Sequence, residues 1–270
     1  MNALVFTLRD EPAQRLDLSP LVPQRLAGLN EKDIASTAIS TTREQVAVGE
    51  VFKIGMGDAA QIRFEGGSER FDRLGAAMAD GDIAVNGAVG IQAGRLMQGG
   101  RLTIDGSAGP WAGSGMRGGV LEIKGSAGDR LGGPLAGETA GMRGGVLIVR
   151  GDAGERAGDR LRRGTILIDG GAGPYVGSRM IAGTVIVRGR AGPLPGYLMA
   201  RGTLVLGAGA AALSPTFSDC GVHDLVANTL IANFVRPFSP DLAAILTKPL
   251  RRLLGDMAVI GRGEILCPAD

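Results

Sequence analysis

The sequence has 270 residues, with 29 basic and 27 acidic side chains, 46 glycines, two cysteines and one histidine. A net charge of +2 and only ten aromatic residues (one Trp, two Tyr and seven Phe) disfavour a nucleic-acid-binding protein, which needs concentrated positive charge and rings for base stacking. Glycine makes up about 17% of the chain, against roughly 7% in ordinary proteins. It does not recur at every third position, as collagen requires, and 44% of the residues are hydrophobic, which disfavours disorder. The composition is therefore typical of a folded chain made of repeats.

The sequence shows no sign of export or of membrane insertion. The first residues lack the basic region and the long apolar stretch of a secretory signal, and no uncharged stretch reaches the roughly 18 residues of a membrane-spanning helix. Cys220 and Cys267 are too few to form a disulfide framework. We therefore expect a cytoplasmic protein that binds neither membranes nor nucleic acid.

A glycine-flanked strand motif recurs along the middle of the chain. Copies lie at residues 60–66, 81–87, 99–106, 118–125, 144–151, 164–170, 183–189 and 202–208. The residue that opens each strand recurs every 19 positions, except for a first step of 21 and one step of 26 that contains a seven-residue insertion within 131–141. A constant period of this length indicates a repeat architecture in which each unit packs on its neighbours.

Within each copy the apolar residues alternate, as they do in a strand with one buried face. The expected inward residues are Leu102/Ile104, Leu121/Ile123, Leu147/Val149, Ile166/Ile168 and Val185/Val187, joined by Met97, Met116, Met142, Leu161, Met180 and Met199. One 19-residue coil cannot bury its own inner side chains, whereas stacked coils can. The sequence therefore predicts an all-β fold, a single-stranded parallel β-helix of about eight 19-residue coils.

The two flanks lack the repeat and are expected to cap the ends of the stack. Residues 1–55 form the expected amino-terminal cap, 56–207 the repeat domain and 208–270 a carboxy-terminal extension. In the extension, residues 241–254 are expected to be partly helical with an interruption at Pro249. Residues 257–260 are expected to form a strand.

No motif in the sequence predicts catalysis or a metal site in this chain. Residues 113–118 match the G-x-G-x-x-G pattern, but these glycines belong to the repeat and lead into a strand rather than a helix. Cys220 and His223 could supply two metal ligands, yet a closed zinc site needs four, so a plain turn is the favoured interpretation. We expect no catalytic residue and no metal ligand.

The outward positions of the later strands form a flat apolar face. Its central residues are Val146, Ile148, Leu167, Ile186 and Val205. A monomer seldom exposes such a patch, so something must cover it. A partner subunit is the favoured cover, and the chain's own tail is the alternative.

Positive charge is concentrated in the repeats. Residues 95–206 hold 15 basic and 8 acidic side chains, whereas residues 1–94 hold 9 and 13. A third outward row, expected to be a solvated charge ladder, reads Asp105, Lys124, Arg150, Asp169 and Arg188. Four cations, Lys124, Arg150, Arg188 and Arg190, are the main candidates for contact with an anionic ligand or an acidic partner. Four further arginines of the late repeats could face the same ligand or partner, namely Arg143, Arg162, Arg163 and Arg201. The alternative is that they serve solubility alone.

The repeat seen in Ala108–Gly125 resembles the glycine-rich β-helix shared by the C subunit of formylmethanofuran dehydrogenase and the last domain of the glutamate synthase large subunit. Residues 8–29, and the closing segment 255–266, look like the dehydrogenase C subunit. Glutamate synthase also needs amidotransferase and flavin domains, for which 270 residues leave no room.

This resemblance implies a non-catalytic subunit of a complex that handles formyl groups on methanofuran-type coenzymes during one-carbon oxidation of formaldehyde to formate. In methylotrophic bacteria the related assembly is the formyltransferase/hydrolase complex. Its implied partners are an amidohydrolase-like hydrolase subunit, a formyltransferase subunit and a dehydrogenase-like subunit, which hold the coenzyme and the metal ions. The archaeal counterpart is a tungsten or molybdenum dehydrogenase.

The bacterial form of this complex is favoured, since arginine outnumbers lysine 25 to 4. A different class, a free-standing β-helix enzyme acting on polysaccharides, would need clustered carboxylates. The outward rows offer only scattered Asp105, Glu122 and Asp169.

Overall fold

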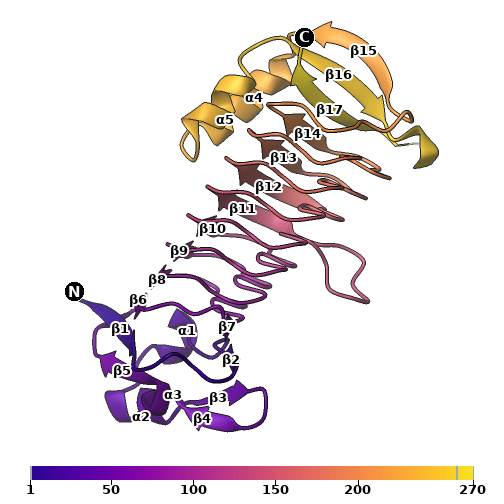
Figure 1. Ribbon diagram of the computed structural model, residues 1–270. Helices are drawn as coiled ribbons and strands as arrows, with labels where there is room; N and C mark the ends of the chain where they lie inside the picture. The colour runs from indigo at the N-terminus through magenta and orange to yellow at the C-terminus, as the bar shows by residue number, and fades with distance from the viewer. Residues whose placement is uncertain (1, 260, 270) are drawn as a thin grey trace.

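A 13-stranded sheet forms the long axis of the molecule, as the computed structural model in Figure 1 shows; the structure describes residues 2–259 and 261–269. Neighbouring strands follow the order β15-β16-β17-β14-β13-β12-β11-β10-β9-β8-β6-β1-β5. Its parallel central part comprises β6 (Asp58–Glu65), β8 (Asp82–Asn86), β9 (Arg101–Ile104), β10 (Val120–Ile123), β11 (Arg143–Val149), β12 (Arg163–Ile168), β13 (Thr184–Val187) and β14 (Thr203–Leu206). These are the eight copies of the motif that the sequence predicts.

Equivalent residues of successive repeats pair with one another. Leu121 of β10, for example, lies opposite Leu102 on one side and Leu147 on the other. A second column of single bridges joins Ala108 to Ala127, Ala127 to Ala153, and so on to Ala210. The chain therefore returns to the same two columns once per repeat, and the layers stack along the axis seen in Figure 1.

The predicted inward residues form the core. Every one of the paired strand residues and methionines predicted above is no more than 1% exposed. The alternation of strand side chains places these residues on one face, and stacking aligns them into continuous rows. The prediction of the buried face is confirmed.

Glycine is required where successive layers approach each other most closely. A Cβ atom on Gly118 would lie 2.2 Å from the carbonyl oxygen of Gln98 in the layer below, and one on Gly144 would lie 2.2 Å from the carbonyl oxygen of Arg117. No side chain fits at such a distance from a backbone atom. These contacts explain the first glycine of the pairs at 99–100, 118–119 and 144–145, whereas the later repeats hold Arg163, Ala182 and Arg201 at that position.

The amino-terminal segment closes one end of the sheet. It contains β1 (Ala3–Leu8), β2 (Leu16–Asp17), α1 (Pro23–Leu26), α2 (Glu31–Ser36), β3 (Ala38–Thr41), β4 (Gln45–Ala47), α3 (Val48–Val51) and β5 (Phe52–Gly55), and β7 (Phe71–Asp72) pairs with β2. Strand β1 runs parallel to β6, and β5 runs antiparallel to β1 as the last strand of the sheet. The Phe6 and Phe64 rings stack with centroids 5.1 Å apart, so β1 extends the core of the repeats.

The carboxy-terminal tail closes the other end. It contains β15 (Ser218–His223), α4 (Val226–Val235), α5 (Pro240–Ile245), β16 (Leu250–Gly255) and β17 (Gly263–Pro268). Strand β17 pairs in parallel with β14, and β16 and β15 follow in antiparallel order. The predicted helical content of 241–254 is confirmed only in α5, before Pro249, because residues 250–254 belong to strand β16. Residues 257–260, predicted as a strand, instead hold a short 3-10 helix at Met257–Val259, and Ile260 lies outside the described residues.

The outward apolar face is covered by this tail, which corrects the expectation that another subunit does so. Val146, Ile148, Leu167, Ile186 and Val205 are 0–7% exposed within the single chain. They form one cluster with residues of α4, α5 and β16, namely Ala232, Val235, Leu242, Ala243, Leu246 and Leu250. The physical reason is that burying this face removes it from water, and the tail supplies the apolar side chains to do so.

Candidate functional site

The predicted charge ladder exists, and its cations are paired with carboxylates. Lys124 Nζ lies 2.6 Å from Asp105 Oδ1. Arg150 reaches in two directions, to Glu122 Oε1 at 2.6 Å and to Asp169 Oδ2 at 3.0 Å. Each pair joins different repeats, so the ladder binds successive layers together.

Protonation of the ladder cations is reinforced by these contacts. Burial alone would lower the pKa of Arg150, but hydrogen bonds to Asp169 and Glu122 outweigh burial and hold that pKa above its ordinary value. The hydrogen bond to Asp105 likewise raises the pKa of Lys124. Both groups remain charged at neutral pH, and their charge is balanced by neighbours in the same chain.

The other two candidate cations have different roles. Arg188 donates from Nε to the carbonyl oxygen of Asp169 at 2.8 Å and lies 3.3 Å from Asp241 of α5, so it links the ladder to the tail. Arg190 is exposed and forms no ion pair with the described residues. The structure therefore brings Lys124, Arg150 and Arg188 into one ladder and leaves Arg190 outside it.

A set of unpaired arginines, here called the basic corner, lies where the chain enters each strand. It comprises Arg117, Arg143 and Arg162, with Arg163 and Arg201 beside them. The backbone N–H groups of the first three bond to the carbonyl oxygens of Met97, Met116 and Met142, so the three residues occupy equivalent positions in consecutive layers. All five side chains are exposed, and none forms an ion pair with the residues that the structure describes.

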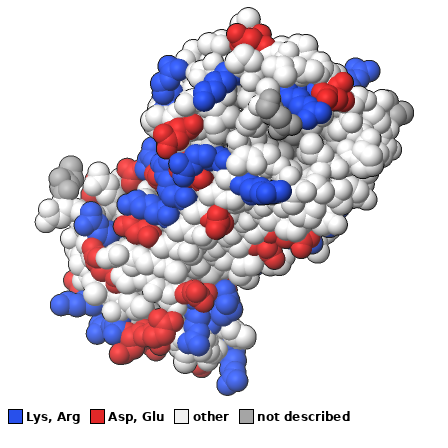
Figure 2. Space-filling model, turned by 45° about the horizontal axis from the view of Figure 1, so that its top comes forward, with Lys and Arg blue, Asp and Glu red and all other residues white. Residues whose placement is uncertain are grey.

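The basic corner concentrates positive charge that forms no ion pair among the described residues, although Arg143 is near enough to Glu138 to help lower the pKa of that carboxyl. Consecutive strands lie about 4.8 Å apart, so the three stacked guanidinium groups start from neighbouring positions. Like charges placed opposite each other on adjacent strands repel, and an anion would relieve that repulsion. Figure 2 shows basic side chains gathered beside acidic ones on one side of the molecule, with much of the remaining visible surface uncharged.

The sequence indicated Arg143, Arg162, Arg163 and Arg201 as basic residues of the late repeats that could face an anion, but it did not identify Arg117 or the equivalence of Arg117, Arg143 and Arg162. The signal was present, because Arg143 and Arg162 are 19 residues apart and Arg117 precedes Arg143 by the one long step of 26. Aligning the residues just before each strand, as well as those within it, identifies the corner.

The seven-residue insertion forms one wall of a cavity of about 340 Å³. Glu138 holds this wall in place, since its carboxylate lies 2.8 Å from Arg95 and its carbonyl oxygen accepts from Arg160 at 3.1 Å. The hydrogen bond from Arg95 keeps the pKa of Glu138 below its ordinary value. Behind the wall, fully buried Asp159 accepts from Ser178 Oγ at 2.8 Å and Arg179 Nε at 2.9 Å.

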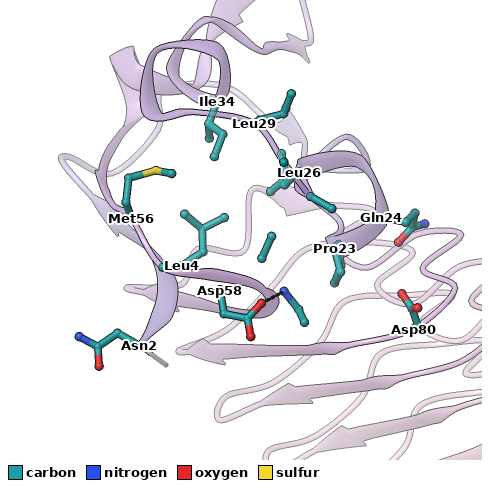
Figure 3. A pocket seen from close by; sticks show the side chains of 15 residues that line it. Asn2, Leu4, Pro23, Gln24, Leu26, Leu29, Ile34, Met56, Asp58 and Asp80 are labelled. Carbon is teal, nitrogen blue, oxygen red and sulfur yellow. Dashed lines mark hydrogen bonds between the residues drawn. The ribbon is translucent and has the colours of Figure 1, made fainter.

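A larger hollow, of about 820 Å³, lies at the amino-terminal end (Figure 3). Its apolar lining includes Leu4, Leu26, Ile34 and Met56, which come from β1, α1, α2 and the segment before β6. Asp58 accepts a hydrogen bond from the backbone of Ala60 within the lining. Leu4, Leu26 and Ile34 are buried members of the amino-terminal core, whereas most of the other lining residues, Met56 among them, are exposed.

The tail residues considered as metal ligands do not assemble into a site. His223 Nε2 lies 2.8 Å from the carbonyl oxygen of Cys220, both on the exposed strand β15. Among residues 2–259 and 261–269, no three His, Cys, Asp or Glu side chains converge as metal ligands. No helix in the described part of the chain is long and apolar enough to span a membrane.

These features define a glycine-rich repeat protein whose charged side chains tie layers together and, at the basic corner, point to solvent. No family model matches the sequence. The C subunit of the Fhc formyltransferase/hydrolase complex from Methylorubrum extorquens is 51% identical over 262 residues, covering 97% of this chain and 98% of the relative.

The crystal structure of that organism's FhcABCD complex with methylofuran contains a chain of the same fold. Its TM-score is 0.95 at 43% identity, covering 98% of this chain and 100% of the matched one. The chain therefore belongs to the family of C subunits of the formyltransferase/hydrolase complex.

Proposed function

We propose that this chain is the scaffold subunit of a formyltransferase/hydrolase complex and carries no catalytic residue of its own. The observation that supports this most strongly is the full-length match to a relative whose structural counterpart sits in a four-subunit assembly. The side chains capable of chemistry also support it. Arg150, Arg179 and Glu138, for example, are each engaged in contacts that join separate repeats.

The proposed partners are a formyltransferase subunit, an amidohydrolase-like metal-dependent subunit and a dehydrogenase-like subunit, acting together in the cytoplasm. The formyltransferase would transfer the formyl group to the furan coenzyme, and the amidohydrolase-like subunit would release formate. The metal ions would belong to these partners.

We further infer that residues 56–207 form a single-stranded parallel β-helix, with 1–55 and 208–270 as its caps. Support comes from the 19-residue register of β8–β14, the second column of bridges, and the extension of the sheet by β1 and β17. Such a stack offers partners a long, stiff surface on which to be held at fixed spacing.

The basic corner is proposed to contact the anionic tail of the furan coenzyme. The matched crystal structure holds methylofuran, and an extended carboxylate-bearing chain could run along stacked arginines. Arg190 is assigned to the same role, because it too lacks an ion pair among the described residues. Lys124, Arg150 and Arg188 are also candidates from the sequence. We assign them mainly to joining the repeats to one another and to the tail, because each already forms an ion pair with a carboxylate of the same chain.

Affinity purification of the tagged full-length chain from its native cells tests the scaffold proposal. A formyltransferase and an amidohydrolase-like subunit should co-purify in fixed ratio, without tungsten or molybdenum. Recovery with a tungsten or molybdenum subunit would indicate the dehydrogenase form. Recovery of the chain free of any such partner would overturn the proposal.

Charge reversal tests the role of the basic corner. Arg143→Glu with Arg162→Glu should weaken binding of the complex to the furan coenzyme at least tenfold and reduce the salt dependence of binding. The matched control is Arg25→Glu with Arg43→Glu, two exposed arginines of the amino-terminal segment, with an expected change below twofold. Equal affinity in both double variants would remove the corner from coenzyme binding.

A further inference from the structure

The cavity beside the insertion holds more positive charge than its own carboxylates balance. Its charged lining residues are Arg130, Arg160, Arg179, Glu138 and Asp159. Arg179 pairs with Asp159, and Glu138 pairs with Arg95 from outside the lining. Neither Arg130 nor Arg160 forms an ion pair with the residues that the structure describes. Two positive charges at the cavity are therefore left without an anion.

These two arginines are partly withdrawn from water and fixed in place. Both are half-buried, and Arg160 donates from Nη1 to the carbonyl oxygen of Glu138 at 3.1 Å. The backbone N–H of Arg130 bonds to the carbonyl oxygen of Glu155 at 2.7 Å. A cation that is partly shielded from water attracts an added anion more strongly than a fully exposed cation does. The cavity differs in this respect from the basic corner, whose five side chains are exposed.

The backbone at the cavity has a conformation that large side chains seldom adopt. Left-handed φ angles of 61°, 57°, 50° and 53° occur at Trp111, Arg130, Arg160 and Arg179. Glycine adopts this conformation without the steric cost that a larger residue meets. Each of these turns already has a left-handed glycine two positions away, at Gly113, Gly132, Gly158 and Gly177. The geometry of the turns alone therefore does not explain the arginines and the tryptophan.

Apolar groups complete the wall of the cavity. Trp111, the one tryptophan of the sequence, lies 19 residues before Arg130, at the equivalent position of the preceding layer. The insertion adds Pro134 and Leu135, and Figure 1 shows the loop before β11 extending farther than the other turns. An apolar wall with a few charged groups is typical of a site for a small organic molecule.

We propose that this cavity binds a small organic dianion, a dicarboxylate or a phosphate monoester, through Arg130 and Arg160, with the body of the ligand against Trp111. Guanidinium groups match carboxylate and phosphate oxygens with paired N–H donors. The volume of about 340 Å³ is near the lower end of the range for small-molecule sites, so the ligand is compact. The inference goes beyond the scaffold proposal and does not depend on which partners the chain binds.

Fluorescence of Trp111 measures binding at the cavity directly, because the chain has no other tryptophan. The isolated full-length chain is titrated with glutarate and, separately, with glycerol phosphate at constant ionic strength. At least one of the two should give a saturable change with a dissociation constant below about 1 mM. Glutaramide, which has the carbon skeleton of glutarate without its charge, should give none. Failure of both dianions to bind, established also by calorimetry, would overturn the inference.

A double substitution tests the two unpaired arginines. Arg130→Gln with Arg160→Gln should weaken binding of the responding dianion at least tenfold. The matched control is Arg25→Gln with Arg43→Gln, which removes the same charge from exposed positions of the amino-terminal segment and should change the affinity less than twofold. Thermal melting establishes that both double variants are folded. Equal affinities of the two variants would exclude Arg130 and Arg160 from the site.

Arg130→Gly separates a role in binding from a role in the fold. Glycine accepts the φ of +57° at this position and keeps the backbone N–H that bonds to Glu155. The variant should therefore melt at or above the wild-type temperature while it binds the dianion at least threefold more weakly. Loss of stability with unchanged affinity would assign Arg130 to the fold and contradict the inference.

Assembly distinguishes a small ligand from an acidic segment of a partner subunit. Calorimetry on the purified complex should give an affinity for the dianion within about threefold of that of the isolated chain. Loss of binding on assembly, with protection of residues 130–138 from hydrogen exchange, would assign the cavity to a partner and overturn the inference. That result would leave the scaffold proposal intact, whereas recovery of the wild-type chain without partners would overturn the scaffold proposal alone.

Discussion

Ser239 Oγ donates a hydrogen bond to Asp169 Oδ1 at 3.0 Å and thereby joins the first turn of α5 to the charge ladder. The same hydroxyl caps α5 by accepting from the backbone N–H of Leu242 at 3.4 Å. The Asp169 carboxylate also forms an ion pair with Arg150, so this one group connects two repeats and the tail. The position of the tail on the sheet is thus specified by polar contacts as well as by apolar packing.

Replacing Ser239 with alanine should lower the free energy of unfolding by about 1–2 kcal/mol, because both the helix cap and the bond to Asp169 are lost. Urea denaturation of the full chain measures the change. Ser40→Ala, at an exposed strand position, should change the free energy by less than about 0.5 kcal/mol. Equal effects of the two substitutions would contradict the assigned role of Ser239.

Leu167→Ala should destabilise the isolated chain by about 2–5 kcal/mol, since it leaves a cavity between β12 and the tail. Leu213→Ala, in an exposed loop, serves as the control. The free energy of unfolding of the purified chain, without partners, is the measurement. If a partner rather than the tail covered this face, Leu167→Ala would cost the isolated chain little.

Gly118→Ala should cost about 3 kcal/mol or more, because the added Cβ would meet the carbonyl oxygen of Gln98 at 2.2 Å. Gly137→Ala, in the insertion, would meet no atom within 4 Å and carries only the strain of its positive φ of +84°. Its expected cost is about 1–2 kcal/mol. Thermal melting ranks the two, and the reverse order would refute close layer packing at Gly118.

The contact between Glu138 and Arg95 predicts a stability difference that depends on pH. Because Arg95 lowers the pKa of folded Glu138, its ionised form stabilises the fold above the unfolded pKa, near 4.3, and this contribution is lost as pH falls through the folded pKa. Glu138→Gln should therefore be less stable than wild type at pH 7, with the difference shrinking below about pH 4.5. Denaturation at pH 7, 5 and 3.5 measures it, and a constant difference would argue against the ion pair.

The repeat core could be predicted from the sequence because its causes are local and periodic. Alternation within Leu121–Ile123 identifies the buried side of one strand, and the 19-residue spacing extends that result to its neighbours. The tail could not be predicted in the same way. Its helix α4 holds no ionisable residue and only three polar ones, Asn228, Thr229 and Asn233. The place of α4 depends on contacts with residues such as Ile186, about 40 positions earlier.

The charged residues show a similar division. Arg150 was a reasonable ligand candidate by composition, but its partners Glu122 and Asp169 belong to neighbouring repeats, so only the alignment of layers shows the charge to be balanced. The same alignment identifies Arg117, Arg143 and Arg162 as equivalent. The sequence predicted which charged residues lie on the outer side of the strands. Which of them form ion pairs could be seen only in the structure, where the layers are aligned.

The order in which the chain leaves the ribosome gives the self-covered face a further consequence. Val205 is synthesised about 45 residues before Leu250, the last tail residue of the cluster that covers it. At roughly 5–20 residues per second, translation leaves the apolar face without its cover for roughly 2 to 9 s. During that interval the nascent chain exposes a flat apolar surface, and chaperone binding is expected to be concentrated there.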